Sequence, residues 1–334
     1  MSKVSIQDVA NHAGVSIATV SYVINNTKTV KPETRIKVEQ SIKALDYSPN
    51  QSARMFKTGR SRLIGFIVPD IANTFFATLI EAVENKLAEE NYKLLIVNTK
   101  ETKEREIESI KALGNGWVDG LILASTMDDY PKELKGILPT SLPVVLVDRT
   151  LSGFPFDQVI VDCYSATYEG VENLVKLGHK KIGYISGLKR ISTTMERNRA
   201  YSDVMNKYHL YNDALIQIGD SMRFNVASNL NALLDIGCTA LVIANNVMTS
   251  EALIQLTSKH IIPGKDIDIV GFKDSNLSQF GFDSINFVYQ PTTDLGDTVG
   301  NRILDRINHP NTPYQKIELT ASFFQNTSHQ RQAP

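Results

Sequence analysis

Short apolar runs alternate with longer amphipathic runs from residue 61 to residue 325. The short runs have the length of buried strands, and the longer runs have the spacing of helices. Strands that alternate with helices form parallel sheets covered on both faces, and about 265 residues is enough for two such lobes. The expected strands are 63–68, 94–97, 121–123, 144–147, 182–185, 241–243 and 267–272, and the clearest expected helices are 76–89, 168–177, 197–208 and 250–259.

Residues 6–25 show a different pattern, with two short helical spacings separated by Gly14. A glycine tolerates the left-handed geometry of a tight turn. Ser16 is a good N-cap for the second helix. A third helix follows, with Pro32 in its first turn. This order predicts a small all-α helix-turn-helix head.

The second helix of the head has an unusual outward face. If Val20 and Val23 face the core, Ile17 and Tyr22 point outward. The major groove of DNA accepts apolar contacts at thymine methyl groups, and a tyrosine hydroxyl reaches base edges or phosphates. Two isolated exposed apolar residues are the ordinary alternative.

Residues 47–60 follow the head and allow two interpretations. The segment is basic and carries an apolar residue, Phe56. It is either a plain linker or a hinge that inserts an apolar side chain between base steps in the minor groove.

Charge separates the two parts of the chain. The 334 residues have a net charge of −1, but residues 1–60 hold nine Lys or Arg against four Asp or Glu, which gives +5 and leaves −6 for the rest. A basic head on an acidic body favours a nucleic acid partner for the head. The sequence has no run of 18 apolar residues and no apolar segment of a signal peptide, so we expect a cytoplasmic protein without a membrane partner. Its two cysteines predict neither disulfides nor a metal site, and we expect no cofactor.

Several runs of sequence resemble the lactose-repressor (LacI) family of bacterial transcription regulators. They are SIQDVANHAGVSIATVSYVIN, TRIKVEQSIKALDYSPNQSAR, LIGFIVPDIANTFF, VVLVDR, HKKIGYISG, ALVIANN, DIVGF and QPTTDLG. The resemblance covers nearly the whole chain. It implies a repressor with a helix-turn-helix head, a hinge helix and a core like periplasmic sugar-binding proteins. It also implies a homodimer on a pseudo-palindromic operator, bound to the nucleoid, and a small effector, often a sugar.

The resemblance also implies the domain limits and the DNA contacts. It implies a head at 1–46, a hinge at 47–60 and a core at 61–334. Three crossovers would make the lobes discontinuous, with the N-lobe at about 61–161 and 291–319 and the C-lobe at about 162–290 and 320–328. The implied contacts to DNA are Ser16, Ile17, Ala18, Thr19, Ser21, Tyr22 and Asn25 in the head, and Asn50, Ala53, Arg54 and Phe56 in the hinge.

Polar residues directly after the apolar runs predict the ligand site of the core. In open α/β sheets the ligand lies beyond the carboxyl ends of the strands, and a set of polar residues there suits a hydrogen-bonding cleft. Phe75 and Phe76 are expected either as its apolar floor or as ordinary core. The expected polar residues are Asp70, Asn73, Ser125, Asp148, Arg149, Lys189, Arg190, Asn245 and Lys273.

The resemblance implies that Arg197 and Asn245 contact the effector, but Lys273 departs from the family's usual aspartate. A lysine only donates hydrogen bonds and adds positive charge. With Lys189, Arg190 and Arg197 it would make a basic rim, so we expect an anionic effector such as a sugar acid, a keto-deoxy sugar acid or a sugar phosphate. Pairing of Lys273 with a neighbouring carboxylate is the alternative.

Other functions find less support in the sequence. The run GNGWVDG (114–120) precedes a strand, whereas a dinucleotide-binding loop follows one, and Gly114 is expected to end a helix. We therefore expect no enzyme. A sugar-binding protein, control by a neutral sugar, and control by a protein corepressor remain open. Arg302 and Arg306 are expected to form either a corepressor patch or a solvated face.

Overall fold

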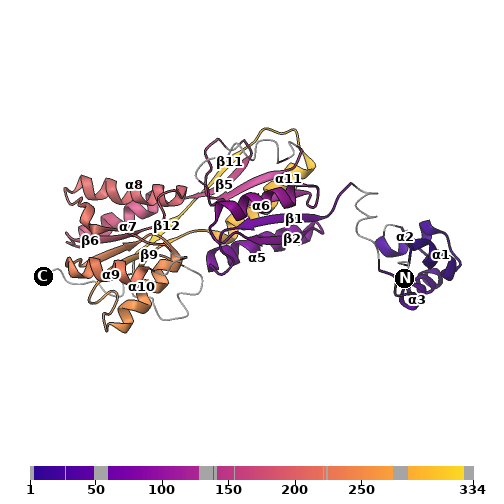
Figure 1. Cartoon of the computed structure of the whole chain (residues 1–334), viewed down its shortest axis with the longest axis horizontal. Helices are drawn as coiled ribbons and strands as arrows, with labels where there is room; N and C mark the ends of the chain where they lie inside the picture. Colours follow the sequence, from indigo (N-terminus) through magenta and orange to yellow (C-terminus); the bar gives the residue numbers. More distant parts are fainter. Residues whose placement is uncertain are drawn as a thin grey trace. The chain divides into compact units, whose positions relative to one another are not determined.

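The computed structural model describes residues 4–26, 28–48, 59–127, 138, 141–153, 155–220, 222, 225–273 and 285–326. The chain divides into two compact units, Met1–Ser61 and Arg62–Pro334. Figure 1 shows the elements of both units.

Over the described residues 4–26 and 28–48, the head contains the helices α1 (Ile6–Ala13), α2 (Ile17–Asn25) and α3 (Pro32–Ala44). Ser5 and Asp8 form a capping box at the start of α1, and Gly14 ends α1 with φ 65°. The small core of the head contains Val9, Ala10, Val20, Val23 and Val38. The predicted helix-turn-helix is confirmed, with the turn at the predicted glycine.

The core unit consists of two α/β lobes, which confirms the predicted fold class (Figure 1). The N-lobe sheet has the order β11-β5-β4-β3-β1-β2, and all of its pairs are parallel. Its strands are β1 (Leu63–Val68), β2 (Lys93–Asn98), β3 (Gly120–Leu123), β4 (Val144–Asp148), β5 (Asp157–Asp162) and β11 (Lys316–Thr320). Its helices are α5 (Thr74–Glu89), α6 (Lys103–Gly114) and α11 (Thr292–Asn308).

The C-lobe sheet has the order β12-β10-β9-β8-β6-β7. Its strands are β6 (Ile182–Ser186), β7 (Ile216–Ile218), β8 (Ala240–Ile243), β9 (Asp268–Phe272), β10 (Asn286–Tyr289) and β12 (Ser322–Phe324). Its helices are α7 (Tyr164–Lys176), α8 (Ser192–Lys207), α9 (Val226–Asp235) and α10 (Asn246–Ser258), with a short 3-10 helix at Asp213–Leu215.

Two features of the sheets differ from the sequence prediction. The edge strand β12 is antiparallel to β10, because the chain continues from β11 through Ala321 into the C-lobe, whereas β10 runs toward the passage between the lobes (Figure 1). Strand β2 is not a buried strand, since Leu95 is 37 % exposed and Ile96 is 43 % exposed at the sheet edge.

Helices cover both faces of each sheet. The Cβ position of Gly65 lies against Leu113 of α6, whereas that of Gly120 lies against Ile303 of α11 on the other face. In the C-lobe, Gly170 of α7 faces Val270, and Gly271 faces Thr249 of α10. Successive residues of β9 therefore point to opposite helical layers: Val270 points to α7 and Gly271 points to α10. By the same alternation, Lys273 points to the α10 side.

The chain passes between the lobes three times, after β5, after β10 and after β11. Ala321 donates its backbone N–H to the carbonyl of Asp162 at 2.9 Å, which joins the first and third passages. Gln290 lies on the second passage, between β10 and α11.

A buried ion cluster holds α11 against the N-lobe sheet. Asp157 is fully buried, and its carboxylate contacts Nε of Arg302 at 2.9 Å and Nε of Arg306 at 2.8 Å. The two arginines are only 6 % and 3 % exposed. The expectation that they form a corepressor patch or a solvated face is wrong, because both side chains point into the lobe toward Asp157.

We expect Asp157→Asn to lower the free energy of unfolding by about 3–5 kcal/mol, because two buried guanidinium groups lose their counter-charge. Urea unfolding measures this loss. Asp305→Asn is the control, since Asp305 contacts the same Arg302 at 2.6 Å but is 43 % exposed. Because Asp305 itself is exposed to water, its contact with Arg302 should contribute only about 1 kcal/mol or less. Equal losses in both variants would contradict this account of the cluster.

Candidate functional site

Helix α2 presents an outward face that matches the predicted orientation of its side chains. Val20 and Val23 are buried, whereas Ile17 is 42 % exposed and Ala18 is exposed beside it. The Ser16 hydroxyl accepts the backbone N–H of Thr19 at 3.2 Å and fixes the start of the helix. The apolar Ile17 is thus held on the first turn of a capped helix.

The polar side chains of the same face are ordered by contacts within the head. The Asn25 amide donates to the Ser21 carbonyl at 2.9 Å. The ammonium group of Lys28 lies 4.9 Å from the centre of the Tyr22 ring, which leaves a positive charge beside the tyrosine. The predicted hinge contacts Asn50, Ala53, Arg54 and Phe56 lie outside the described residues.

The core contains a cavity of about 80 Å³ at the edge where strands of both lobes end. That is room for several water-sized groups. Its lining comes from both lobes and from the second passage between them: Asp70, Asn73, Phe75, Phe76, Glu101, Asp148, Arg149, Gly187, Leu188, Ile191, Thr193, Thr194, Arg197, Gly219, Met222, Asn245, Asn246 and Gln290.

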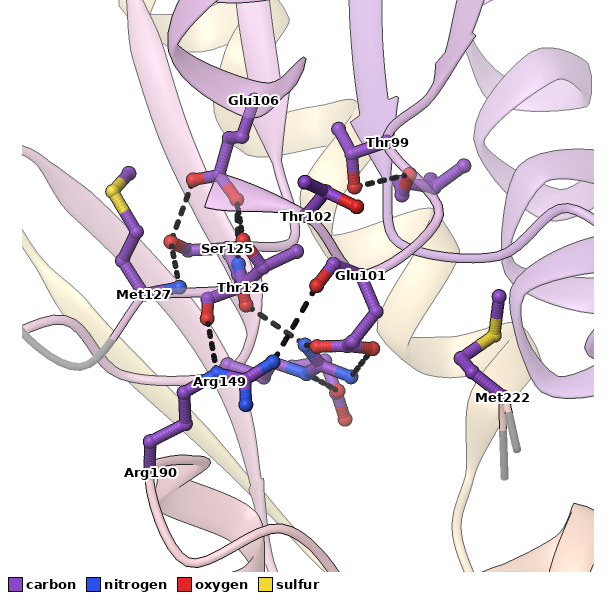
Figure 2. A network of polar contacts seen from close by, with 12 residues as sticks. Thr99, Glu101, Thr102, Glu106, Ser125, Thr126, Met127, Arg149, Arg190 and Met222 are labelled. Atoms are coloured by element: carbon purple, nitrogen blue, oxygen red, sulfur yellow. Dashed lines mark hydrogen bonds and ion pairs between the residues drawn. The ribbon is translucent and has the colours of Figure 1, made fainter. Parts of the chain in front are cut away.

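Arg149 and Asp148 form the N-lobe wall of the cavity at the end of β4. Asp148 has φ 65°, and Arg149 donates its backbone N–H to Val147 at 2.7 Å, so the chain turns sharply after the strand. Burial raises the pKa of the Asp148 carboxyl, and the neighbouring guanidinium of Arg149 opposes that rise. The Arg149 side chain is held by both carboxylate oxygens of Glu101 (Figure 2).

A second carboxylate, Glu106, anchors the loop after β3 from inside the lobe. It is fully buried and accepts Ser125 Oγ at 2.7 Å, the Thr126 N–H at 2.6 Å and Thr126 Oγ1 at 2.7 Å (Figure 2). Burial raises the pKa of Glu106, and these hydrogen bonds oppose the rise. Ser125 therefore serves the frame of the site and does not line the cavity.

Arg197 of α8 forms the C-lobe wall. It is 6 % exposed, and its guanidinium stacks over the Phe272 ring with 3.9 Å to the ring centre. It donates to the Ala244 carbonyl, to Gln290 Oε1 at 3.5 Å and to the Cys163 sulfur at 3.9 Å. Burial raises the pKa of the Cys163 thiol to about 11, so this thiol stays protonated.

Three buried N–H donors of the cavity lining have no hydrogen-bond acceptor among the described residues. They are Nε of Arg149, Nε of Arg197 and Nε2 of Gln290. A buried donor without an acceptor costs about 1–3 kcal/mol. Oxygen acceptors of a bound molecule would satisfy these donors.

The structure brings most of the predicted effector residues together. Asp70, Asn73, Phe75, Phe76, Asp148, Arg149, Arg197 and Asn245 all line the cavity. Phe75 and Phe76 also pack edge to face, with ring centres 5.2 Å apart. Asn73 and Asn245 in addition cap α5 and α10.

Four predicted residues do not line the cavity. Lys273 points to the opposite layer, with its ammonium group 4.5 Å from the centre of the Phe287 ring. Lys189 is exposed, and Ser125 faces Glu106. Arg190 donates to the Thr126 carbonyl at 3.2 Å and to the Glu101 carbonyl at 3.4 Å, which links the two lobes. The expected basic rim is not assembled, because its lysines point elsewhere.

Other lining residues were absent from the sequence prediction. Glu101, Thr193, Thr194 and Gln290 belong to this group. Glu101 lies three residues past β2, too far from the strand end for a rule that takes the polar residues directly after each strand. Gln290 follows a short strand that the apolar pattern did not predict.

Other contacts join the lobes beside the cavity. The amide of Asn246 donates to Asn73 Oδ1 at 2.8 Å, and the backbone N–H of Thr150 donates to Ser192 Oγ at 2.8 Å. The described residues contain no group of three or more His, Cys, Asp or Glu side chains able to hold a metal ion. Among the described helices, none is long and apolar enough to cross a membrane.

A pair of carboxyl groups lies at the first passage between the lobes. Glu196 precedes Arg197 on α8; its carboxyl group is hydrogen-bonded to that of Asp162 and accepts the Cys163 N–H at 3.3 Å. Burial, followed by the contact with Asp162, raises the pKa of Glu196 to about 7. A hydrogen bond between two carboxyl groups requires one shared proton.

A helix-turn-helix head joined to a two-lobe ligand-binding core defines a DNA-binding transcription regulator. Two family models match the chain: "Bacterial regulatory proteins, lacI family" over residues 5–50, and "Periplasmic binding proteins and sugar binding domain of LacI family" over residues 61–327. The chain belongs to the lacI family of bacterial regulatory proteins.

Individual relatives match over almost the full length. The catabolite control protein A of Priestia megaterium is 30 % identical and covers 92 % of this chain and 94 % of its own. The transcriptional repressor PurR of Haemophilus influenzae is 31 % identical, and the match covers 95 % of this chain and 96 % of that protein. A crystal structure of the Lac repressor dimer bound to operator and an anti-inducer superimposes with a TM-score of 0.81 at 25 % identity, covering 98 % of this chain and 99 % of that one.

We expect the stability of the protein to decrease as the pH rises from about 4.5 to 7 because of Glu196. In this pH window the Glu196 carboxyl keeps its proton in the folded state and loses it in the unfolded chain. Its contribution to the free energy of unfolding is therefore fully present below pH 4.5 and is lost as the pH rises through the folded pKa of about 7. Glu196→Gln stays neutral and should flatten the dependence in urea unfolding at pH 5, 6, 7 and 8. Glu104→Gln, an exposed glutamate on α6, should retain it. Equal slopes in wild type and Glu196→Gln would contradict the assignment.

Proposed function

We propose that this DNA-binding regulator is a homodimeric repressor of a carbohydrate-use operon, and that a sugar-like effector in the cavity controls it. The observation that carries the proposal is the set of three buried donors around the cavity, together with the Asp148 carboxyl group in its lining. A hydroxyl group both accepts and donates, so a polyhydroxylated molecule satisfies both kinds of partner at once. As a bacterial DNA-binding protein it would work in the cytoplasm, on the nucleoid.

Operator binding would use the outward face of α2. Ile17 and Ala18 are the apolar groups available for thymine methyl contacts, and Tyr22 carries a hydroxyl at its rim. Ser16, Thr19, Ser21 and Asn25 would contact phosphates and fix the orientation. The Lac repressor structure is that of a dimer on operator DNA. The exposed apolar residues Leu95 and Ile96 on the edge strand β2 support a dimer here as well.

The anionic-effector hypothesis rested on Lys273. Because Lys273 and Lys189 lie outside the cavity lining, the proposal does not retain an acidic sugar. Control by a protein corepressor through Arg302 and Arg306 is not retained either, because both are buried.

We expect Ile17→Ala and Tyr22→Ala each to weaken binding to the operator about tenfold or more, since one base contact contributes about 1–3 kcal/mol. The operator is first selected from random DNA by the full-length protein, and affinities are then measured at fixed salt. Binding to unrelated DNA should stay the same, because phosphate contacts are kept. Ile36→Ala is the matched control, an apolar residue of α3 that is 52 % exposed. Operator affinity that is unchanged in both α2 variants would refute the proposed reading face.

We expect Asp148→Asn to reduce effector affinity about tenfold or more and to leave operator affinity without effector unchanged. The variant keeps the shape of the side chain but loses the charged acceptor. Titration of a sugar panel into the protein–operator complex gives both quantities. Asp297→Asn, an exposed change on α11, controls for net charge. If no sugar released the operator from wild type, the sugar-like effector would be wrong.

A further inference from the structure

The guanidinium of Arg149 is largely occupied by Glu101 although it lines the cavity. Nη1 contacts Oε1 at 2.6 Å and Nη2 contacts Oε2 at 3.1 Å, and Nη1 also donates to the Ser125 carbonyl at 2.9 Å (Figure 2). The two side chains are only 11 % and 12 % exposed. Such a two-point pair in a buried place is among the stronger polar contacts of proteins.

The backbone adopts an uncommon conformation to bring Glu101 to this position. Lys100 and Glu101 have φ values of 52° and 56°, so two consecutive non-glycine residues are left-handed. The turn is fixed by the Glu101 N–H on the Pro69 carbonyl at 3.0 Å and by Arg190, which donates to the Glu101 carbonyl from the other lobe. Strained residues of this kind persist where the surrounding contacts hold them. Glu101 is therefore a fixed part of the cavity wall.

The ion pair between Arg149 and Glu101 changes the charge that a ligand meets in the cavity. The described lining has three carboxyl groups, Asp70, Glu101 and Asp148, against two guanidinium groups, Arg149 and Arg197, which gives a formal charge of −1 with all five groups ionised. Arg149 is shielded by Glu101 and also by Asp148, whose Oδ2 lies 3.7 Å from its Nε. A ligand carboxylate would meet these acidic groups in a place where water screens poorly.

The donors that remain are suited to neutral oxygen atoms. Nε of Arg149 still lacks a hydrogen-bond acceptor, as do Nε of Arg197 and Nε2 of Gln290. A hydroxyl or ring oxygen satisfies such a donor without bringing a charge toward Glu101 and Asp148.

We propose that Glu101 sets the charge selectivity of the effector site. By holding Arg149 at two points, it makes the cavity select uncharged polyhydroxylated ligands and reject the corresponding acids. The inference rests on the proposed function, because it assumes that the effector occupies this cavity.

The test compares wild type, Glu101→Gln and Glu104→Gln as full-length proteins. Glu104 lies on the first turn of α6, is exposed, and changes the formal charge by the same amount without contact to Arg149. One arm measures the affinity for inorganic phosphate at constant ionic strength by thermal shift. The other arm compares the affinities for glucose, galactose and mannose with those for glucuronate, galacturonate and mannuronate.

We expect wild type and Glu104→Gln to bind the neutral sugars at least tenfold more tightly than the acids. In Glu101→Gln the guanidinium of Arg149 is freed, so the affinity for phosphate should rise about tenfold or more. The affinity for each acid relative to its neutral sugar should rise by the same factor, which corresponds to one charge-assisted contact. A wild-type preference for acids, or equal phosphate affinities in all three proteins, would overturn the proposal.

Two further outcomes are decided by the same design. If no sugar shifts the melting temperature of wild type, the sugar-like effector is wrong, while the phosphate arm still decides the role of Glu101. If Glu101→Gln does not fold, Glu101→Asp replaces it. Its shorter side chain keeps the charge but loosens the two-point contact, so a smaller gain in phosphate affinity supports the proposal and no gain overturns it.

Discussion

A buried guanidinium must have acceptors on several sides, and Arg197 obtains them from parts of the chain that are far apart in sequence. Its contacts are the Ala244 carbonyl at the end of β8, Cys163 on the first passage between the lobes, Gln290 on the second, and the Phe272 ring below. One side chain therefore holds the cavity wall and two of the three connections between the lobes. A ligand that binds its free Nε adds a partner to the group that fixes the lobe connections.

The lobes are also joined by contacts that involve the cavity wall itself. Asn73 caps α5 and accepts from Asn246, while Arg190 donates to the backbone of Glu101. Each such hydrogen bond contributes about 1 kcal/mol net, which is the size of typical couplings between distant sites. An effector that contacts Asn73 or Glu101 thus acts on groups that already set the lobe arrangement. Only a difference in its affinity for two arrangements can shift them.

The fold was largely predictable because local patterns determine most of it. The apolar runs give the ends of β1, β3, β4, β6, β8 and β9 within one residue, whereas β5 and β10, which also lie inside the sheets, were not predicted. The apolar spacing predicts helix starts that are too late: α8 begins at Ser192 with a polar first turn, and α10 begins at Asn246, where Asn245 caps it. Exposed or very short strands such as β7 and β12 carry too few buried residues to give a signal. The edge position of β2 depends on sheet order, which no local pattern contains.

The position of the cavity could be predicted from the sequence, but the net charge of its lining could not. The strand-end rule found Asp70, Asp148 and Asn245 because parallel strands end at one edge. It failed at Lys273 because it ignores the alternation along β9, where Phe272 faces Arg197 and the next residue must face α10 and Phe287. Phe272 is the last residue of the predicted strand and faces Arg197 on the cavity side. Because side chains alternate along a strand, the next residue, Lys273, must point away from the cavity. An arginine considered alone in the sequence indicates an available positive charge. Here a carboxylate far away in the sequence occupies that charge: Glu101 pairs with Arg149, and Asp157 pairs with Arg302 and Arg306. A count of strand-end cations therefore overestimates the positive charge of such a cavity.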